Sequence, residues 1–298
     1  MHPLIESLIK TGPVVTDGSW GTQMQARGLK RGECPDSWNL SHPEQVIEVA
    51  RQYVDAGSQI ILTNTFGGSR LSLEKYKLGH KAVEINMAGV RISKKAAGEH
   101  AYVFASIGPS GKMLITRETT EEELQNAFEE QANAQVSAGA DGIIVETMID
   151  IVEAGIAANA AKQTGLPVIV SMVFDSGEHR DRTMMGNTPE EFVAEIAKIG
   201  VDGIGANCGQ GIEAFLPICT RMRQATDLPI WMKPNAGLPE VVDDKAVFRT
   251  TAQEFAQYIP DLIQAGANFI GGCCGSDREF VKAIRELVDE LKMISSRN

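Results

Sequence analysis

Cysteine residues follow two short apolar segments of the sequence. Cys273 and Cys274 are adjacent in Gly271-Gly272-Cys273-Cys274-Gly275, and Cys208 follows the apolar residues 203–207. Adjacent side chains of a regular strand point to opposite faces, so Cys273 and Cys274 can serve one site only if the strand ends there and turns. Glycine permits such a turn. The pattern therefore predicts either a site shared by three thiols or small buried hydrophobic side chains, a common state of free cysteine.

Three thiolates from two strand ends would suit a catalytic zinc ion. Such a zinc ion typically has three protein ligands and an open fourth position for water or substrate. The sequence contains no CxxC or HxxxH pair that would supply a standard fourth ligand. Cys34 lies in a predicted loop and Cys219 in a helical pattern, and we expect both to be unligated. The remaining candidate metal ligands are scattered histidines without ligand spacing, namely His42, His80, His100 and His179.

Eight short apolar segments alternate with longer amphipathic segments along the chain, and each pair is read as a strand followed by a helix. The predicted strands are Pro13–Asp17, Gln59–Asn64, Tyr102–Ile107, Gly142–Glu146, Pro167–Phe174, Gly203–Asn207, Pro229–Lys233 and Asn268–Gly271. The predicted helices are Pro43–Ala56, Arg70–Gly98 with an interruption, Glu121–Ala138, Asp150–Gln163, Pro189–Lys198, Ile212–Gln224, Thr251–Gln264 and Asp277–Met293.

Eight strand–helix units without a linker predict an α/β protein with a (β/α)8 barrel, in a single domain spanning residues 1–298. The alternative is an open doubly wound sheet, which would have fewer parallel strands. Barrel enzymes carry their chemistry at the carboxyl ends of the strands. Polar residues should therefore collect directly after the apolar segments.

Polar residues do follow several of these segments. Asp17 and Asn64 could instead cap turns, whereas Glu146 closes an apolar run and a buried carboxylate needs a partner. Lys233 could be the Schiff-base lysine of an aldolase-like barrel, which would require a desolvated amine. The candidate substrate-binding residues at these ends are Asp17, Gly18, Ser19, Asn64, Thr65, Glu146 and Asn235.

Composition and charge narrow the classes of function. The net charge of −11 argues against nonspecific nucleic-acid binding, which needs a basic surface. No apolar run approaches the roughly 20 residues of a membrane span, and the first residues do not form a secretory signal. The five cysteines are an odd number without a disulfide-type spacing, which favours a reducing cytoplasm.

The motifs together resemble the homocysteine S-methyltransferases, most closely the homocysteine-binding module of cobalamin-dependent methionine synthase. The resemblance covers nearly the whole chain, and its specific part is Asn207-Cys208 with Gly271–Gly275. Ser19 and Trp20 depart from the Asp-Gly-Gly that the family often carries in its first loop. The other motifs are Asp17-Gly18-x-x-Gly21-Thr22, Thr63-Asn64-Thr65-Phe66, Val145-Glu146-Thr147 and Pro234-Asn235-Ala236-Gly237.

The resemblance implies a zinc ion on Cys208, Cys273 and Cys274 and homocysteine in the barrel mouth. Zinc would hold the substrate sulfur as the thiolate, which is the nucleophile, so no general base is needed. Glu146 is suited to the substrate ammonium, and the Asn235 side-chain oxygen could fill the fourth zinc position before substrate arrives. The substrate carboxylate would be bound by backbone amides around Gly18 and Ser19, with Asn64 and Thr65.

The methyl donor implied by the resemblance is methylcobalamin carried by a separate corrinoid protein. S-methylmethionine and S-adenosylmethionine are alternatives, and betaine would favour an aromatic cage, for which Trp20, Phe66 and Trp38 are candidates. A thiol-binding subunit without turnover is a further alternative. The segment Ser176–Asn187 either covers the mouth or is a solvated loop, and the second interpretation is favoured.

Overall fold

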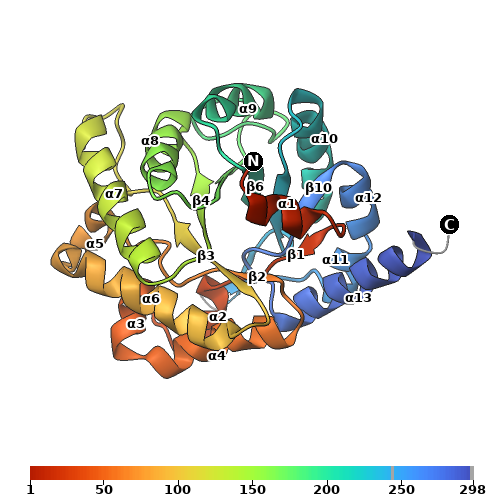
Figure 1. Cartoon of the computed structure of the whole chain (residues 1–298), viewed down its shortest axis with the longest axis horizontal. Helices are drawn as coiled ribbons and strands as arrows, with labels where there is room; N and C mark the ends of the chain where they lie inside the picture. The colour runs from red at the N-terminus through yellow and green to blue at the C-terminus, as the bar shows by residue number, and fades with distance from the viewer. Residues whose placement is uncertain (243–244, 296–298) are drawn as a thin grey trace.

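The computed structural model describes residues 1–242 and 245–295, and its described strands include an eight-stranded parallel barrel (Figure 1). The order around the barrel is β1-β10-β7-β6-β5-β4-β3-β2, and a parallel bridge between Thr16 and Ile60 brings the two ends together. The barrel strands are β1 (Val14–Val15), β2 (Ile60–Ile61), β3 (Tyr102–Ile107), β4 (Gly142–Met148), β5 (Val168–Met172), β6 (Gly203–Gly211), β7 (Ile230–Asn235) and β10 (Ala267–Ile270).

Helices surround the barrel, as Figure 1 shows. The helices of the described chain are α1 (Pro3–Ile9), α2 (Gly21–Ala26), α3 (Trp38–Ser41), α4 (Pro43–Asp55), α5 (Arg70–Glu74), α6 (Ala82–Ala97), α7 (Glu121–Ser137), α8 (Ile151–Lys162), α9 (Pro189–Ile196), α10 (Phe215–Ala225), α11 (Ala252–Ala256), α12 (Ile259–Gln264) and α13 (Arg278–Ser295). Short 3₁₀ turns are η1 (Pro35–Ser37), η2 (Gly79–Lys81), η3 (Ala197–Ile199) and η4 (Ile212–Ala214).

The predicted barrel is confirmed, and each predicted strand overlaps an observed one, although β4, β6 and β7 extend beyond the predicted carboxyl ends and β10 begins one residue earlier than predicted. The predicted helix Thr251–Gln264 is divided into α11 and α12, with Pro260 near the start of the second helix. Proline lacks the N–H that an interior helical position needs, but it fits the first turn. The predicted interruption in Arg70–Gly98 is confirmed, because η2 separates α5 from α6.

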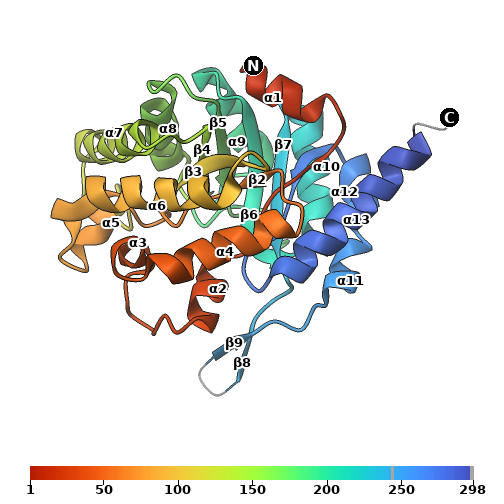
Figure 2. The ribbon, with the colours of Figure 1, turned by 60° about the horizontal axis from the view of Figure 1, so that its bottom comes forward.

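An antiparallel hairpin of β8 (Glu240–Val242) and β9 (Lys245–Val247) was not predicted from the sequence. It follows β7 and projects from the body of the protein, at the end opposite to α1 (Figure 2). Val241 and Val242 are exposed, so the segment has no buried face that would produce a strand-like alternation of apolar and polar residues.

Aromatic side chains fill the interior of the barrel. Trp231 stacks with Phe104 at a centroid distance of 6.5 Å and lies 5.5 Å from the ring of Phe269. The apolar cluster around them includes Ile5 and Leu8 of α1, which therefore closes the amino-terminal end of the barrel. The opposite end, where the strands finish, stays open for a site. None of the described helices combines the length and the apolar character needed to cross a membrane.

Candidate metal and acceptor site

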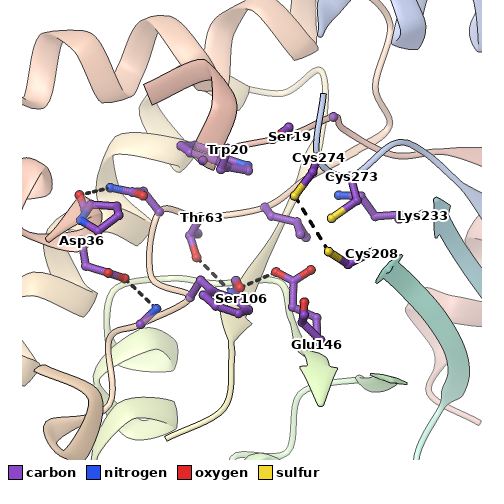
Figure 3. A pocket seen from close by; sticks show the side chains of 18 of the residues that line it. Ser19, Trp20, Asp36, Thr63, Ser106, Glu146, Cys208, Lys233, Cys273 and Cys274 are labelled. Atoms are coloured by element: carbon purple, nitrogen blue, oxygen red, sulfur yellow. Dashed lines mark hydrogen bonds between the residues drawn. The ribbon is translucent and has the colours of Figure 1, made fainter. Parts of the chain in front are cut away.

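The sulfur atoms of Cys208, Cys273 and Cys274 meet at the carboxyl ends of β6 and β10. All three sulfurs lie within 4.8 Å of one another, and Cys208 Sγ is 3.8 Å from Cys274 Sγ (Figure 3). The three residues are partly buried and none is in a disulfide. This arrangement favours the shared site over the interpretation as inert core cysteines.

Backbone geometry brings the two cysteine segments together. Cys208 has φ of 64° and Gly209 φ of 77°, so the chain makes a left-handed turn at the first thiol. A left-handed conformation is strained for a residue other than glycine, and such strain persists where surrounding structure holds it. At the second segment, Gly275 has φ of 84°, and a Cβ there would lie 2.2 Å from the ring of Phe248. Glycine is therefore required at that turn.

Residues at the end of β7 form hydrogen bonds with the loop that carries Cys273 and Cys274. The Cys273 N–H donates to Pro234 O at 2.7 Å, and the Cys274 N–H donates to Asn235 Oδ1 at 3.1 Å. The Ala236 N–H in turn donates to Cys274 O at 2.9 Å. These hydrogen bonds turn the loop so that both adjacent side chains reach one site.

Asn207 is a site residue whose role the sequence did not reveal. Its Oδ1 accepts hydrogen bonds from Thr147 N at 2.8 Å and Ser171 Oγ at 2.7 Å. Its Nδ2 donates to Thr147 Oγ1 at 2.6 Å and lies 4.0 Å from Cys273 Sγ. Asn207 is fully buried, so it ties the ends of β4, β5 and β6 together beneath the thiols.

The charges of the three thiols favour a bound cation. Hydrogen bonds from Cys273 and Cys274 hold the pKa of Cys208 far below its usual range. The interaction with Cys208 raises the pKa of Cys273 and of Cys274. Without a cation, these two thiols therefore resist deprotonation once Cys208 is a thiolate. A metal ion removes this conflict because it deprotonates the thiols that coordinate it. The residues thus fit zinc, for which thiolates are preferred ligands.

A cavity of about 460 Å³ extends away from the cysteines. Trp20 lies between the cysteine end and a distal end near Asp36, as Figure 3 shows. The residues that line it are Gly18, Ser19, Trp20, Gly21, Pro35, Asp36, Leu62, Thr63, Asn64, Phe66, Gly67, Ser72, Lys75, Tyr76, Ser106, Glu146, Thr147, Cys208, Lys233, Gly272, Cys273 and Cys274. The size and the concave shape fit a small-molecule site.

Glu146 lines the cavity next to the cysteines. Its Oε1 accepts a hydrogen bond from Ser106 Oγ at 2.5 Å, and burial raises the pKa of Glu146 to about 7, although Lys233 opposes the rise. Ser106 therefore holds one carboxylate oxygen of Glu146, and the residue lines the cavity that a substrate would fill.

The residues expected near the substrate carboxylate differ in their access to the cavity. Gly18, Ser19 and Asn64 line it, but the Ser19 N–H donates to Ser276 O at 3.3 Å. The Asn64 amide donates to Pro35 O at 2.8 Å. Thr65 is fully buried behind the cavity wall and is not among its lining residues.

Asp17 and Asn235 lie behind the cavity wall. Asp17 Oδ1 forms an ion pair with Lys233 Nζ, while Oδ2 accepts hydrogen bonds from Leu62 N at 2.7 Å and Trp20 Nε1 at 2.8 Å. Asn235 uses its side-chain oxygen to hold Cys274 N. The two side chains thus position neighbouring residues of the site.

Most of the chain matches a known protein family. The family model described as "Homocysteine S-methyltransferase" matches residues 14–288. The chain belongs to this family. The methionine synthase of Mycobacterium leprae is 28% identical over 96% of this chain and 25% of its own length, and that of Mycobacterium tuberculosis is 26% identical over 94% and 25%. The chain thus spans about a quarter of these curated relatives.

Solved structures give the same fold. The homocysteine methyltransferase MmuM from Escherichia coli matches in its oxidized form with a TM-score of 0.81 and 22% identity, over 96% of this chain and 99% of that one. Its metallated form matches with a TM-score of 0.80 and 23% identity over the same shares. Family membership confirms the resemblance that the motifs indicated.

In this homocysteine S-methyltransferase family member, Lys233 is a second residue whose role the sequence did not reveal. It is 2% exposed and lines the cavity. Burial lowers its pKa, but Asp17 and Glu146 raise it by more, so the side chain is an ammonium ion at neutral pH. A Schiff-base nucleophile must be a neutral amine, so this environment disfavours the aldolase interpretation.

The other candidates from the sequence lie away from the thiols. Cys34 and Cys219 are buried outside the three-residue cluster, and burial raises their pKa values to about 11 and about 12. No residue of the segment Ser176–Asn187 is among those that line the described cavity. Gln210 Nε2 donates to Arg180 O at 2.6 Å, which ties this segment to the end of β6.

Proposed function

We propose that this protein transfers a methyl group to the sulfur of homocysteine and forms methionine. The observation that carries the proposal is the cluster of three thiol sulfurs within 4.8 Å, at one end of a cavity that also exposes Glu146. Family membership supports the reaction class. In the reaction, the acceptor sulfur forms a bond to the methyl carbon while the bond from that carbon to the donor breaks.

Cys208, Cys273 and Cys274 would hold a zinc ion that keeps the acceptor thiol deprotonated. Glu146 attracts the acceptor ammonium, and the wall formed by Gly18, Ser19 and Asn64 receives its carboxylate. Asp17, Thr65 and Asn235 support this wall and the thiol loop. The carboxyl ends of the strands keep these groups in place, so the acceptor loses little further entropy when its sulfur is oriented. We take residues 1–298 as one acceptor-binding barrel.

The donor that we propose is methylcobalamin on a separate corrinoid protein. Exposed apolar side chains on the loops that follow β2, β3, β5 and β7 support docking of a protein at the mouth. They are Phe66, Ile115, Met184, Leu238, Val241 and Val242. The matched methionine synthases carry most of their length outside the region that resembles this chain, which is compatible with a donor brought by another domain.

A small sulfonium or quaternary ammonium donor is the second candidate, because aromatic rings line the cavity. These are Trp20, Phe66 and Tyr76. Trp38, the third aromatic residue expected from the sequence, instead stacks on His42 at 4.4 Å and does not line this cavity. The free state of all five cysteines supports a reducing cytoplasm as the location.

An anaerobic assay tests the proposed function. Zinc-loaded protein is mixed with homocysteine and one donor at a time: methylcobalamin free or on a corrinoid protein, S-methylmethionine, S-adenosylmethionine or betaine. We expect methionine to accumulate with methylcobalamin and not with Cys273→Ser protein. Methionine from a sulfonium or ammonium donor alone would replace the proposed donor. Thiol binding without methionine from any donor would favour a non-catalytic thiol-binding subunit.

A further inference from the structure

The cavity is larger than the acceptor alone requires. Its volume is about 460 Å³. The eight non-hydrogen atoms of homocysteine would fill about 240 Å³, even if each took the volume of a whole water molecule in the liquid. In the proposed function, the acceptor occupies the end that holds the three cysteines and Glu146. Figure 3 shows Trp20 between that end and Asp36, so the distal end beyond Trp20 has room for a second ligand group. The distal end is lined by Asp36, Phe66, Gly67, Lys75 and Tyr76.

Asp36 brings a buried carboxylate to the distal end. The residue is 4% exposed, and its Oδ1 accepts a hydrogen bond from the Gly67 N–H at 2.9 Å. Its Oδ2 lies 3.9 Å from the Cys34 Sγ, and a thiol is a weak donor. A Cβ at Gly67 would lie 2.9 Å from Oδ2, so this oxygen borders the space that the glycine leaves open. Oδ2 therefore keeps the capacity to accept an N–H from a ligand.

Lys75 supplies a cation beside this carboxylate. The residue is exposed, and its Nζ lies 4.7 Å from the centroid of the Tyr76 ring. Burial raises the pKa of Asp36 to about 6, and the positive charge of Lys75 is among the interactions that oppose this rise. Asp36 is therefore mainly ionised at pH 7, and the charge of Lys75 balances it. Such a neutral pair favours an uncharged ligand group that both donates and accepts hydrogen bonds.

The distal end opens at the face where the donor protein is expected to dock. Phe66 lines the cavity and is also 44% exposed, so it belongs to the apolar residues around the mouth as well. Lys75, which directly follows α5, is exposed on the same cavity. A group that projects from a docked partner can therefore enter the distal end while the acceptor occupies the cysteine end.

The corrin of methylcobalamin carries uncharged groups of this kind. Its acetamide side chains project from the same face as the methyl ligand, whereas its propionamide side chains project from the opposite face. A primary amide offers two N–H donors and a carbonyl acceptor. When the methyl group is directed towards the acceptor sulfur, the acetamides consequently face the barrel.

We propose that the distal end binds an acetamide side chain of the corrin, which donates an N–H to Asp36 Oδ2 and accepts a hydrogen bond from Lys75. The inference rests on the proposed function, because it names the part of the proposed donor that this end recognises. Asp36 and Lys75 thereby orient the donor over the acceptor and are positioning residues.

Hydrolysed forms of methylcobalamin test this contact. One set has a single acetamide converted to a carboxylate, and the control set has a single propionamide converted. Calorimetry with zinc-loaded protein, without homocysteine, gives each Kd, and kcat/KM for methionine formation is then compared. The native protein should bind at least one acetamide-derived acid about tenfold more weakly than methylcobalamin, because that acid lacks the donated N–H and adds a like charge beside Asp36. The propionamide-derived acids should bind as methylcobalamin does.

Two variants locate this preference at Asp36. Asp36→Asn should remove it, because the substituted amide can donate to the new carboxylate. Gly67→Ala should weaken methylcobalamin by roughly tenfold without a change of charge, because the added Cβ covers Oδ2. Both variants should keep the native Kd for homocysteine. Glu153→Gln is the matched control: Glu153 is also 4% exposed and accepts a backbone N–H, from Ser110 at 2.7 Å, but it does not line the cavity.

The outcomes separate this inference from the proposed function. If the native protein binds every acetamide-derived acid as tightly as methylcobalamin, or if Asp36→Asn keeps the native preference, the role of Asp36 is wrong and the proposed donor stands. Weaker homocysteine binding in Asp36→Asn but not in Glu153→Gln would assign the distal end to the acceptor instead. If methionine forms from a sulfonium donor and not from methylcobalamin, free or on a corrinoid protein, the proposed donor and this inference both fall, while methyl transfer to homocysteine stands.

Discussion

Asn207 Oδ1 lies 2.8 Å from Thr147 N, so the residue directly before the first thiol is bonded to the residue directly after Glu146. Thr147, which donates this hydrogen bond, has φ of 60°, and Cys208, which follows Asn207, has φ of 64°. Both residues therefore adopt strained backbone conformations. One buried amide side chain thereby fixes the metal end and the acidic wall relative to each other. The same amide approaches Cys273 Sγ.

Replacement of Asn207 tests this supporting role. Asn207→Ala should weaken zinc binding by roughly 10- to 100-fold, because groups that orient metal ligands commonly contribute this much to affinity. Competition with a chromophoric chelator measures the zinc Kd. Asn86→Ala is the matched control, since Asn86 is also fully buried, but its amide donates to Gly68 O and Ala82 O and the residue does not line the cavity. Equal zinc affinity in the two variants would contradict the role of Asn207.

The cysteines divide into two groups that substitution should separate. Cys208→Ser, Cys273→Ser and Cys274→Ser should each lose tightly bound zinc, because the proposed zinc ion would have these three thiolates as its protein ligands. Cys34→Ala and Cys219→Ala should keep about one zinc per chain and lose only folding stability. Metal content after gel filtration is the measurement. Full retention of zinc in Cys273→Ser would refute the assignment of the ligands.

The sequence was sufficient to predict the barrel and its thiols because both depend on local patterns. Apolar segments predicted the strands, and the glycines beside Cys273 and Cys274 predicted the turn. Contacts between distant residues left no such pattern: Lys233 and Asp17 are separated by 216 positions, and Asn207 meets Thr147 across 60. The strand register brings the two members of each pair into contact. Because packing of the whole barrel sets that register, a local sequence pattern does not predict these contacts. A single lysine in an apolar strand was the available signal for Lys233.

Burial of Glu146 predicts a specific pH dependence of stability. Its pKa rises from 4.5 to about 7, so between these values the folded metal-free protein binds more protons at this site than the unfolded chain does. Stability therefore falls as pH increases through this window. Glu146→Gln should remove up to about 3 kcal/mol of the decrease between pH 5 and pH 8.

Urea unfolding of the metal-free protein at the two pH values provides this measurement. Glu99→Gln is the control, because Glu99 is exposed and should leave the pH dependence as it is in the native sequence. If Glu146→Gln unfolds with the native pH dependence, Glu146 is charged in the folded protein throughout this range, and the effect assigned to its burial is wrong.

Gly275 should be irreplaceable at the cysteine turn. Gly275→Ala combines a left-handed backbone with a contact of 2.2 Å between the new Cβ and Phe248. Gly139→Ala isolates the first effect, because Gly139 has φ of 97° and open space around it, and it should cost about 1 kcal/mol. Gly275→Ala should cost more stability and weaken zinc binding. Thermal unfolding and chelator competition measure the two effects, and Gly275→Ala/Phe248→Ala should recover part of both. Identical losses in the two single variants would exclude the contact with Phe248 as a cause.

Zinc X-ray absorption with and without homocysteine tests most directly whether the acceptor sulfur binds at the three-thiol site. The protein alone should show three sulfur neighbours at about 2.3 Å and one lighter neighbour. Homocysteine should convert the fourth neighbour to sulfur, and selenohomocysteine should place one selenium beside zinc while a proton is released. A coordination shell that still holds three sulfurs and no selenium, in protein saturated with acceptor, would contradict the account.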